Sequence, residues 1–221
     1  MKNLTIFSGA GISEESGIPT FRTGENNIWS QYDPDVVCNI RSWPQNIDKS
    51  LEFFNLVRQE IEICKPNSCH VDIANLEDRF NVNIITTNID ELHEQAGSTN
   101  VIHIHGNIFE SCDLNHHHVV GCNTDINIGD KHHKSNIQLR HNVVMFGEMP
   151  YKFKEAQHII SQTDILIVIG SSLSVYPAAG LVLNSKPPIK YYIDSLAEDL
   201  GGFICIKEKA TLGIKQVIEQ F

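Results

Sequence analysis

Short, continuous apolar segments recur along the chain, and they are rich in the β-branched and aromatic residues that favour strands. They lie at residues 4–7, 82–85, 101–104, 143–146, 165–169 and 191–193. Helical patterns lie between several of them, at residues 49–64, 69–80, 91–96 and 152–162. Continuous apolar runs are typical of strands buried on both faces. The alternation therefore predicts an α/β fold with a doubly wound, parallel, Rossmann-like sheet.

Two segments interrupt this alternation. Residues 23–50 contain Gly24, Pro34, Pro44 and both tryptophans, and residues 107–140 are polar and rich in histidine, with little periodicity. We expect them to belong to a smaller lobe that is inserted twice into the sheet domain. The predicted sheet domain comprises residues 1–22, 76–106 and 141–221, and the predicted small lobe comprises residues 23–75 and 107–140.

Each predicted strand ends in glycine or in a small polar or ionisable residue. The residues that follow the six runs are Gly9, Thr87-Asn88, His105-Gly106, Gly147-Glu148, Gly170-Ser171 and Asp194-Ser195. Strands often end at turn-forming residues, which is the simpler explanation for any one of these positions. Open α/β sheets bind ligands outside the carboxyl ends of their strands, however, so the six positions together predict one crevice.

The run from Gly9 to Arg22 follows the first predicted strand directly. Gly9 and Gly11 allow a sharp turn and a close backbone approach to a ligand. The Ser13-Glu-Glu-Ser16 stretch offers an N-cap and a helix start, where a phosphate is favoured. The third glycine stands at position 17 instead of 14, so the run differs from the common dinucleotide fingerprint.

Composition narrows the partners and the compartment. A net charge of −10 argues against a nucleic-acid surface and is compatible with a cationic peptide. We expect no membrane partner, since no stretch approaches the ~20 apolar residues that cross a bilayer. The six cysteines form no compact framework, which indicates a reducing, cytoplasmic setting. The oligomeric state does not follow from the sequence.

Five motifs occur in order along the chain. The first is the run from Gly9 to Arg22, and the others are Thr86-Thr-Asn-Ile-Asp-Glu-Leu-His93, Val101-Ile-His-Ile-His-Gly106, Val143-Val-Met-Phe-Gly-Glu-Met-Pro150 and Gly170-Ser-Ser-Leu-Ser-Val-Tyr-Pro-Ala-Ala179. In this order they resemble the motifs of the sirtuins, the NAD-dependent protein lysine deacylases. The resemblance covers nearly the whole chain and implies a short, bacterial-type sirtuin. It implies that the sheet domain binds NAD and that an acyl-lysine protein or peptide is the substrate.

The same resemblance implies catalytic roles for three residues. His105 falls at the position of the base that takes a proton from a ribose hydroxyl, after nicotinamide leaves and the acyl oxygen attacks the ribose carbon. Asn88 and Asp90 match the residues around the nicotinamide end of NAD. Asp90 has a second interpretation, because it stands where it could cap the helix that follows. His103 is expected to be structural, and His93 is expected to pack.

The remaining site residues are also implied by the resemblance. Those expected to contact NAD are Gly9, Ala10, Gly11, Ile12, Ser13, Phe21, Arg22, Thr87, Asn88, Ile89, Asp90, His105, Gly170, Ser171, Ser172, Asp194, Ser195 and Ala210. Those expected to contact the substrate are Val144, Phe146, Gly147, Glu148 and Phe54.

Several positions depart from the family pattern. The usual zinc site needs two cysteine pairs, whereas Cys112 and Cys122 are the only cysteines of that region and neither has a paired neighbour. This favours a lost or degenerate zinc site. A mixed site completed by histidines at 116–118 or 132–133 is the alternative. Thr87 stands for a usual glutamine, Asp194 for a frequent asparagine, Asn142 for a histidine and Met145 for a tryptophan.

The acidic-acyl branch of the family carries a Tyr-x-x-Arg pair that binds a succinyl carboxylate. Here the matching residues are Phe54 and Val57, and Arg58 is one position out of register. We therefore expect activity on acetyl or another neutral acyl group. Two alternatives stay open: an NAD glycohydrolase or ADP-ribosyltransferase, and a non-catalytic sensor of NAD or ADP-ribose.

Overall fold

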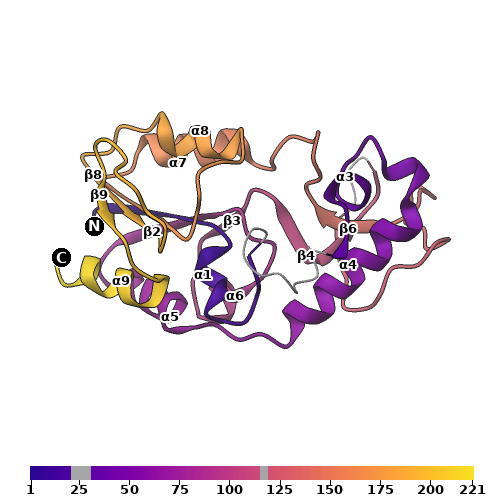
Figure 1. The fold of residues 1–221 in the computed structure, drawn as a ribbon, viewed down its shortest axis with the longest axis horizontal. Helices are drawn as coiled ribbons and strands as arrows, with labels where there is room; N and C mark the ends of the chain where they lie inside the picture. Colours follow the sequence, from indigo (N-terminus) through magenta and orange to yellow (C-terminus); the bar gives the residue numbers. More distant parts are fainter. Residues whose placement is uncertain (21–30, 115–118) are drawn as a thin grey trace.

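The largest element of the fold is a six-stranded parallel sheet (Figure 1). The computed structural model describes residues 1–20, 31–114 and 119–221. The strands lie in the order β3-β2-β1-β7-β8-β9. Their bounds are β1 Asn3–Ser8, β2 Asn81–Thr86, β3 Val101–His103, β7 Ile165–Ile169, β8 Ile189–Ile193 and β9 Ile204–Ile206. The chain reverses its direction of winding between β1 and β7, which is the switch point where such sheets bind ligands.

Helices cover both faces of this sheet (Figure 1). On one face lie α5 (Ser68–Asn75) and α9 (Ala210–Ile218), and on the other lie α7 (Phe153–Ser161) and α8 (Ala178–Leu183). Strand β7 shows why both faces are apolar. Ile167 packs toward α5 and α9, whereas Leu166 and Val168 pack toward α7 and α8. Successive side chains of a strand point to opposite faces, so a strand covered on both sides must be apolar throughout.

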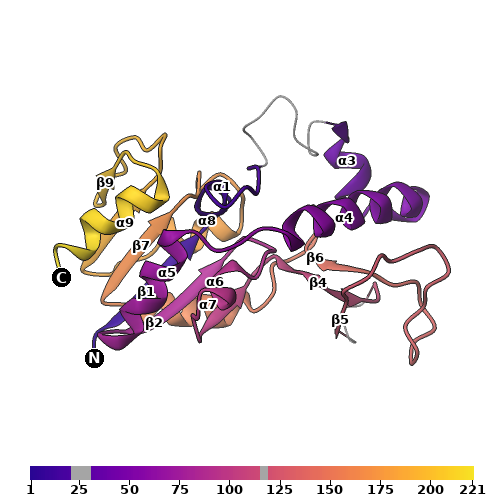
Figure 2. The same ribbon diagram turned by 90° about the horizontal axis from the view of Figure 1, so that it is seen from below.

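A smaller antiparallel sheet lies at the end of the molecule away from both chain termini (Figure 2). It has the order β5-β4-β6, with β4 Gly106–Cys112, β5 Val120–Gly121 and β6 Arg140–Val143. Helix α4 (Ile47–Glu62) packs on it, together with α3 (Pro34–Val37) and the 3-10 turn Trp43–Gln45. The α4 face toward the sheet carries Leu51, Phe54 and Ile61, spaced by three to seven residues, as one stripe of a helix requires.

The predicted fold class is confirmed: the protein is an α/β fold with a doubly wound, parallel, Rossmann-like sheet and a smaller lobe. The assignment of exact residue ranges to two domains stays a prediction. Five of the six predicted strands are strands of the parallel sheet, and the four predicted helices are present. Strand β9 and helices α8 and α9 were not predicted.

The prediction of a parallel strand at residues 143–146 is wrong. The strand in this region is β6, which ends at Val143 and pairs antiparallel with β4 in the small sheet. Residues 144–146 then leave the sheet, and Phe146 exchanges backbone hydrogen bonds with Cys38 and Ile40. A buried apolar run has the same pattern in either sheet, so the sequence could not distinguish the two pairings.

Among the described residues, every helix is too short or too polar to traverse a lipid bilayer.

Among the described histidines, His141 and His70 are buried without full hydrogen bonding and have a pKa well below the ordinary value. His141 of β6 is 1% exposed, and among the described residues neither of its ring nitrogens has a hydrogen-bond partner. Its ring lies 5.9 Å from the ring of Phe54. Burial lowers the pKa of His141 to about 4, and the nearby Arg58 adds to this effect. Burial likewise lowers the pKa of His70, in α5, to about 4.

These histidines should make the fold sensitive to acid. Their pKa is about 4 in the folded state against an ordinary 6.5, so the unfolded chain binds more protons as the pH falls below 6.5. Each should remove about 2 kcal/mol of stability between pH 7 and pH 5. Urea unfolding of His141→Phe should show a smaller loss over this interval than the parent. His158→Phe, at an exposed site on α7, is the control. Equal losses in parent and His141→Phe would contradict the assignment.

Candidate functional site

A tight contact between two glycine turns lies at the switch point of the large sheet. Gly9 N–H donates to the carbonyl of Ile169, and Gly11 N–H donates to the carbonyl of Gly170. A Cβ atom on Gly9 would lie 2.7 Å from the Gly170 oxygen, and one on Gly11 would lie 2.7 Å from the Gly170 Cα. Gly170 itself has a φ of +60°. Side chains would separate the turns, so glycine is required by the packing of backbone on backbone.

The helix after the first turn starts earlier than predicted. Helix α1 spans Gly11–Glu14, and its N-cap is Ala10. Ser13 is therefore inside the helix and fully buried, and the prediction that it caps the helix is wrong. The chain passes from the turn directly into the helix, because the glycines allow the sharp bend without a separate cap residue.

Ser13 instead joins a polar cluster with Asn88 and Asp90. Its Oγ donates to Asp90 Oδ2 at 3.0 Å and accepts from Asn88 Nδ2 at 3.0 Å. The other oxygen of Asp90, Oδ1, accepts the Leu92 N–H at the start of α6 (Leu92–Gln95). The contact with Leu92 agrees with the second interpretation, in which Asp90 binds the start of the helix, and its role at the nicotinamide end stays a prediction. Burial raises the pKa of Asp90, and the hydrogen bonds from Leu92 and Ser13 oppose this rise.

His105 lies between the two sheets, after the end of β3 and directly before β4. Its Nδ1 lies 3.2 Å from the carbonyl oxygen of Thr87. A carbonyl can only accept, so Nδ1 carries the proton and Nε2 is the basic nitrogen. Thr87 N–H in turn donates to the Ser8 carbonyl, next to the first glycine turn. Burial lowers the pKa of His105, and the Thr87 carbonyl opposes this effect.

The neighbouring histidines differ from His105 in their partners. His103 is held at both nitrogens, by the Asn88 carbonyl at 3.1 Å and by Glu94 at 2.7 Å. Burial acts to lower the pKa of His103, but the hydrogen bond and charge of Glu94 raise it overall. His93 is buried, and its Nε2 lies 2.9 Å from Ser8 Oγ. These contacts agree with structural roles for both residues.

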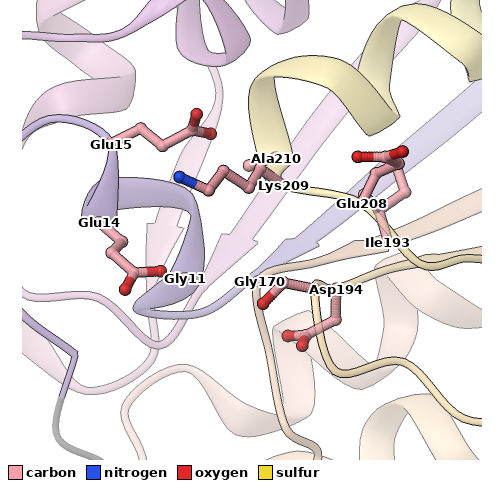
Figure 3. Close-up of a pocket in the computed structure, with 10 residues that line it drawn as sticks. Gly11, Glu14, Glu15, Gly170, Ile193, Asp194, Glu208, Lys209 and Ala210 are labelled. Atoms are coloured by element: carbon pink, nitrogen blue, oxygen red, sulfur yellow. The ribbon is translucent and has the colours of Figure 1, made fainter. Parts of the chain in front are cut away.

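A pocket opens at the carboxyl ends of β1, β7 and β8, beside the glycine turns (Figure 3). The predicted residues that line it are Gly11, Gly170, Asp194, Ser195 and Ala210. The sequence analysis did not identify the other lining residues, which are Glu14, Glu15, Ile193, Glu208 and Lys209. Glu15 connects the end of α1 to α9 at the pocket wall. Its carboxylate accepts both the backbone N–H and the hydroxyl of Thr211 in α9. Charged residues in short turns carry no periodic signal that could have revealed them.

The other predicted cofactor residues lie around these turns. Ser171 packs against Gly9, and Ser172 is hydrogen-bonded to Ser174 at 2.8 Å. Ile12 is fully buried in the core, and the Ile89 carbonyl accepts the Ile108 N–H from β4. Phe21 and Arg22 lie outside the described residues. The cofactor assignments of all these residues stay predictions.

The predicted substrate residues lie on the segment that follows β6. Val144 N–H donates to the His105 carbonyl, so this segment is fixed to the backbone of His105. Glu148 accepts from the buried Arg140 at 2.8 Å and from the Met145 N–H at 2.8 Å, which shapes the turn at Gly147. Phe146 is 44% exposed and Phe54 only 1% exposed. Phe54 therefore belongs to the core of the small lobe, on the face of α4 that packs against the small sheet.

The described residues contain no group of three or more histidine, cysteine or acidic side chains that could hold a metal. Cys112 and Cys122 are both buried, and neither forms a disulfide with another described residue. Burial raises the pKa of Cys112 to about 11. In the part of the chain that the structure describes, these cysteines therefore do not fit a closed zinc site. Their assignment as ligands stays a prediction, since histidines 116–118 lie outside it.

Comparison with known proteins gives a consistent result. Residues 9–177 match the profile of the Sir2 family. The chain is 40% identical to an NAD-dependent protein deacylase of Helicobacter pylori, over 99% of this chain and 96% of that protein. It is 38% identical to the NAD-dependent protein deacylase Sir2 of Mycolicibacterium smegmatis, over 98% and 95% of the two chains. A crystal structure of a Sir2 homologue in complex with NAD matches with a TM-score of 0.87 at 30% identity, covering 99% of this chain and 89% of that one.

Replacing Gly11 with alanine should damage the contact between the turns. The new Cβ would lie 2.7 Å from the Gly170 backbone, so the turns must separate. We expect a loss of about 1–3 kcal/mol in stability, typical of overpacking, and a clear loss of NAD affinity. Thermal unfolding and calorimetric titration with NAD measure the two effects. Gly121→Ala is the control, because a Cβ there meets no atom within 4 Å. Unchanged NAD affinity in Gly11→Ala would show that the turn is not part of the site.

Proposed function

The chain belongs to the Sir2 family, it is an NAD-dependent protein deacylase, and we propose that it removes acetyl or another neutral acyl group from lysine with His105 as the catalytic base. One observation carries the assignment of the base. Asp90, Asn88 and Ser13 form one cluster beside the glycine turn, and His105 is tied to the same strand ends through the Thr87 carbonyl. The predicted catalytic groups thus gather at one edge of the sheet.

Different residues of this chain accept the proton and orient the cofactor. NAD, when bound, supplies a ribose carbon from which nicotinamide can leave. The hydrogen bond from Nδ1 to Thr87 leaves His105 Nε2 unprotonated, so it is the atom that accepts the proton. Because burial lowers the pKa of His105, the imidazole is neutral at physiological pH. The Ser13, Asn88 and Asp90 cluster supplies fixed hydrogen-bonding groups that orient the nicotinamide end.

The glycine turns provide room for the pyrophosphate end of the cofactor. Their backbones approach each other so closely that neither turn can carry a side chain there. The backbone is therefore open to a phosphate where the sheet reverses its winding. The pocket between α1, β8 and α9 would then take the adenosine end.

The environment of Arg58 supports a neutral acyl group. Its guanidinium is buried and paired with Asp125 at 2.8 Å and with Glu62 at 3.0 Å. Its charge is thus already compensated within the small lobe. Phe54 and Val57, at the positions of the family's acid-binding pair, are buried and apolar. A succinyl carboxylate placed there would lose its hydration without gaining a partner.

We propose that the natural substrates are acyl-lysine segments of other proteins, which bind along residues 144–148. In a solved structure of a Sir2 protein, a deacetylated p53 peptide is bound, and that structure matches this chain with a TM-score of 0.78. A cytoplasmic location is supported by the cysteines: all six are described and none forms a disulfide.

Substitution of His105 tests the catalytic assignment. His105→Ala should reduce turnover by about 10²–10⁴-fold, as loss of a general base does, while ADP-ribose affinity changes little. The acid limb of kcat/KM in the parent should lie below pH 6.5, since burial lowers the pKa and only the neutral ring accepts a proton. His158→Ala, on the exposed side of α7, is the control. Full turnover in His105→Ala, or an acid limb centred above pH 6.5, would refute the assignment.

A matched pair of peptides tests the acyl preference. Acetyl-lysine and succinyl-lysine peptides of the same sequence should differ by at least about 10-fold in kcat/KM, in favour of acetyl, because a buried unpaired carboxylate is costly. Mass spectrometry should find nicotinamide, free lysine and O-acyl-ADP-ribose. A succinyl preference would overturn the proposed substrate. Free ADP-ribose without deacylated peptide would instead indicate an NAD glycohydrolase.

A further inference from the structure

Two histidines of one segment contact consecutive carbonyl groups of the neighbouring segment. His105 Nδ1 lies 3.2 Å from the carbonyl oxygen of Thr87, and His103 Nδ1 lies 3.1 Å from that of Asn88. Thr87 and Asn88 directly follow β2, which pairs with β3 in the large sheet. Side chains therefore continue the contact between these two segments beyond the end of the sheet.

His103 differs from His105 in having a second fixed partner. Its Nε2 lies 2.7 Å from Oε1 of Glu94 in α6. The Asn88 carbonyl and the Glu94 carboxylate are both acceptors, so a hydrogen bond to each requires a proton on each ring nitrogen. Burial acts to lower the pKa of His103, whose side chain is 13% exposed, but the hydrogen bond and charge of Glu94 raise it overall. The ring is therefore an imidazolium.

The titratable groups around His103 favour this charged state. Glu94 contacts the ring, and Asp90 is a second acidic neighbour that raises its pKa. Burial lowers the pKa of both His93 and His105, so these two rings are neutral and do not repel the charge on His103.

The ring of His103 holds both ends of the segment that carries the polar cluster. Asn88 begins this segment, and Glu94 lies at its end. Between them, Asp90 accepts from the Ser13 hydroxyl, which itself accepts from the Asn88 side chain. Movement of either end would therefore displace the groups that meet at Ser13.

The charge of His103 also acts on Asp90. Burial raises the pKa of Asp90, while the hydrogen bonds from Leu92 and Ser13 and the charge of His103 lower it. His103 thus helps Asp90 to remain an ionised acceptor for the Ser13 hydroxyl.

Loss of one ring proton would disturb both contacts of His103. A neutral imidazole keeps one N–H, so its other nitrogen presents a lone pair to an oxygen. At 3.1 Å from the Asn88 carbonyl, or at 2.7 Å from the Glu94 carboxylate, this contact is repulsive. An exposed ion pair contributes little beyond stability, but here one of the two contacts is with the backbone of Asn88.

We propose that His103, as an imidazolium held by Glu94, is a positioning residue that fixes Asn88 and Asp90 for the reaction at the nicotinamide end. The inference rests on the proposed function, which gives Asn88 and Asp90 their role there. His103 acts through these two residues and does not touch the reacting atoms. A displacement of about 1 Å in a group that positions a substrate can cost about 10²-fold in rate, so the effect is measurable.

The pH profile of kcat/KM for NAD tests the role of the proton. Because the pKa of His103 is raised, its second proton is present below pH 6.5 and is lost as the pH rises through the folded-state pKa. The parent should therefore show a basic limb centred above pH 6.5. Glu94→Gln should remove this limb, since a side-chain amide can donate to the unprotonated nitrogen of a neutral ring. Glu155→Gln, which removes an exposed carboxylate on α7, is the matched control and should keep the limb.

His103→Phe separates positioning from general damage to the site. It removes both contacts and should lower kcat/KM for NAD by at least about 10-fold. ADP-ribose lacks nicotinamide, so its affinity, measured by calorimetric titration, should fall much less. Glu94→Gln decides the question if His103→Phe does not fold.

Several results would overturn the inference and leave the proposed function intact. They are a parent that turns over without a basic limb, the parent's limb in Glu94→Gln, loss of the limb in Glu155→Gln, and full turnover in His103→Phe. Equal losses of turnover and of ADP-ribose affinity in His103→Phe would also overturn it, because they indicate damage to the whole site. A parent that does not deacylate acyl-lysine peptides would overturn the proposed function, and the inference with it.

Discussion

The close approach of two backbone turns, after β1 and after β7, is the constraint on which the site depends. The Gly11 N–H donates to the Gly170 carbonyl at 2.8 Å, and no side chain fits between the turns. This contact joins the ends of the neighbouring strands β1 and β7, where the winding of the sheet reverses. The polar cluster around Ser13 and the pocket at Asp194 both lie next to this contact.

The second constraint is the short connection that carries His105. Strand β3 of the large sheet ends at His103, and strand β4 of the small sheet begins at Gly106. The imidazole is thus on the chain segment that joins the two sheets. Its backbone carbonyl accepts the Val144 N–H, while its side chain contacts the Thr87 carbonyl. One residue therefore contacts both the strand ends of the large sheet and the segment proposed to bind substrate.

Much of this arrangement follows from sequence patterns, and the exceptions have physical causes. The run at 165–169 predicts a central strand because both of its faces are covered by helices. The run at 143–146 is equally apolar, but its strand residue, Val143, belongs to the small sheet. Burial under α4 requires the same apolar residues as burial in the large sheet, so the pattern does not distinguish the two sheets. Ser13 resembles a cap in sequence, yet it is an internal helix residue whose hydroxyl joins Asn88 to Asp90. Glu15 and Lys209 line the pocket from turns. Turns have no hydrophobic periodicity, so the sequence pattern could not predict that these two residues lie there.

The histidines show how a role can be inferred from the partners of each ring nitrogen. His103 has partners on both nitrogens, so it has no free position for proton transfer. His141 has none among the described residues and is 1% exposed, so it is available to no solute and only makes the fold acid-sensitive. His105 has one nitrogen fixed by a carbonyl, which determines its tautomer and leaves the other basic. A general base needs this intermediate condition: one hydrogen bond to orient the ring, and one lone pair left for the substrate.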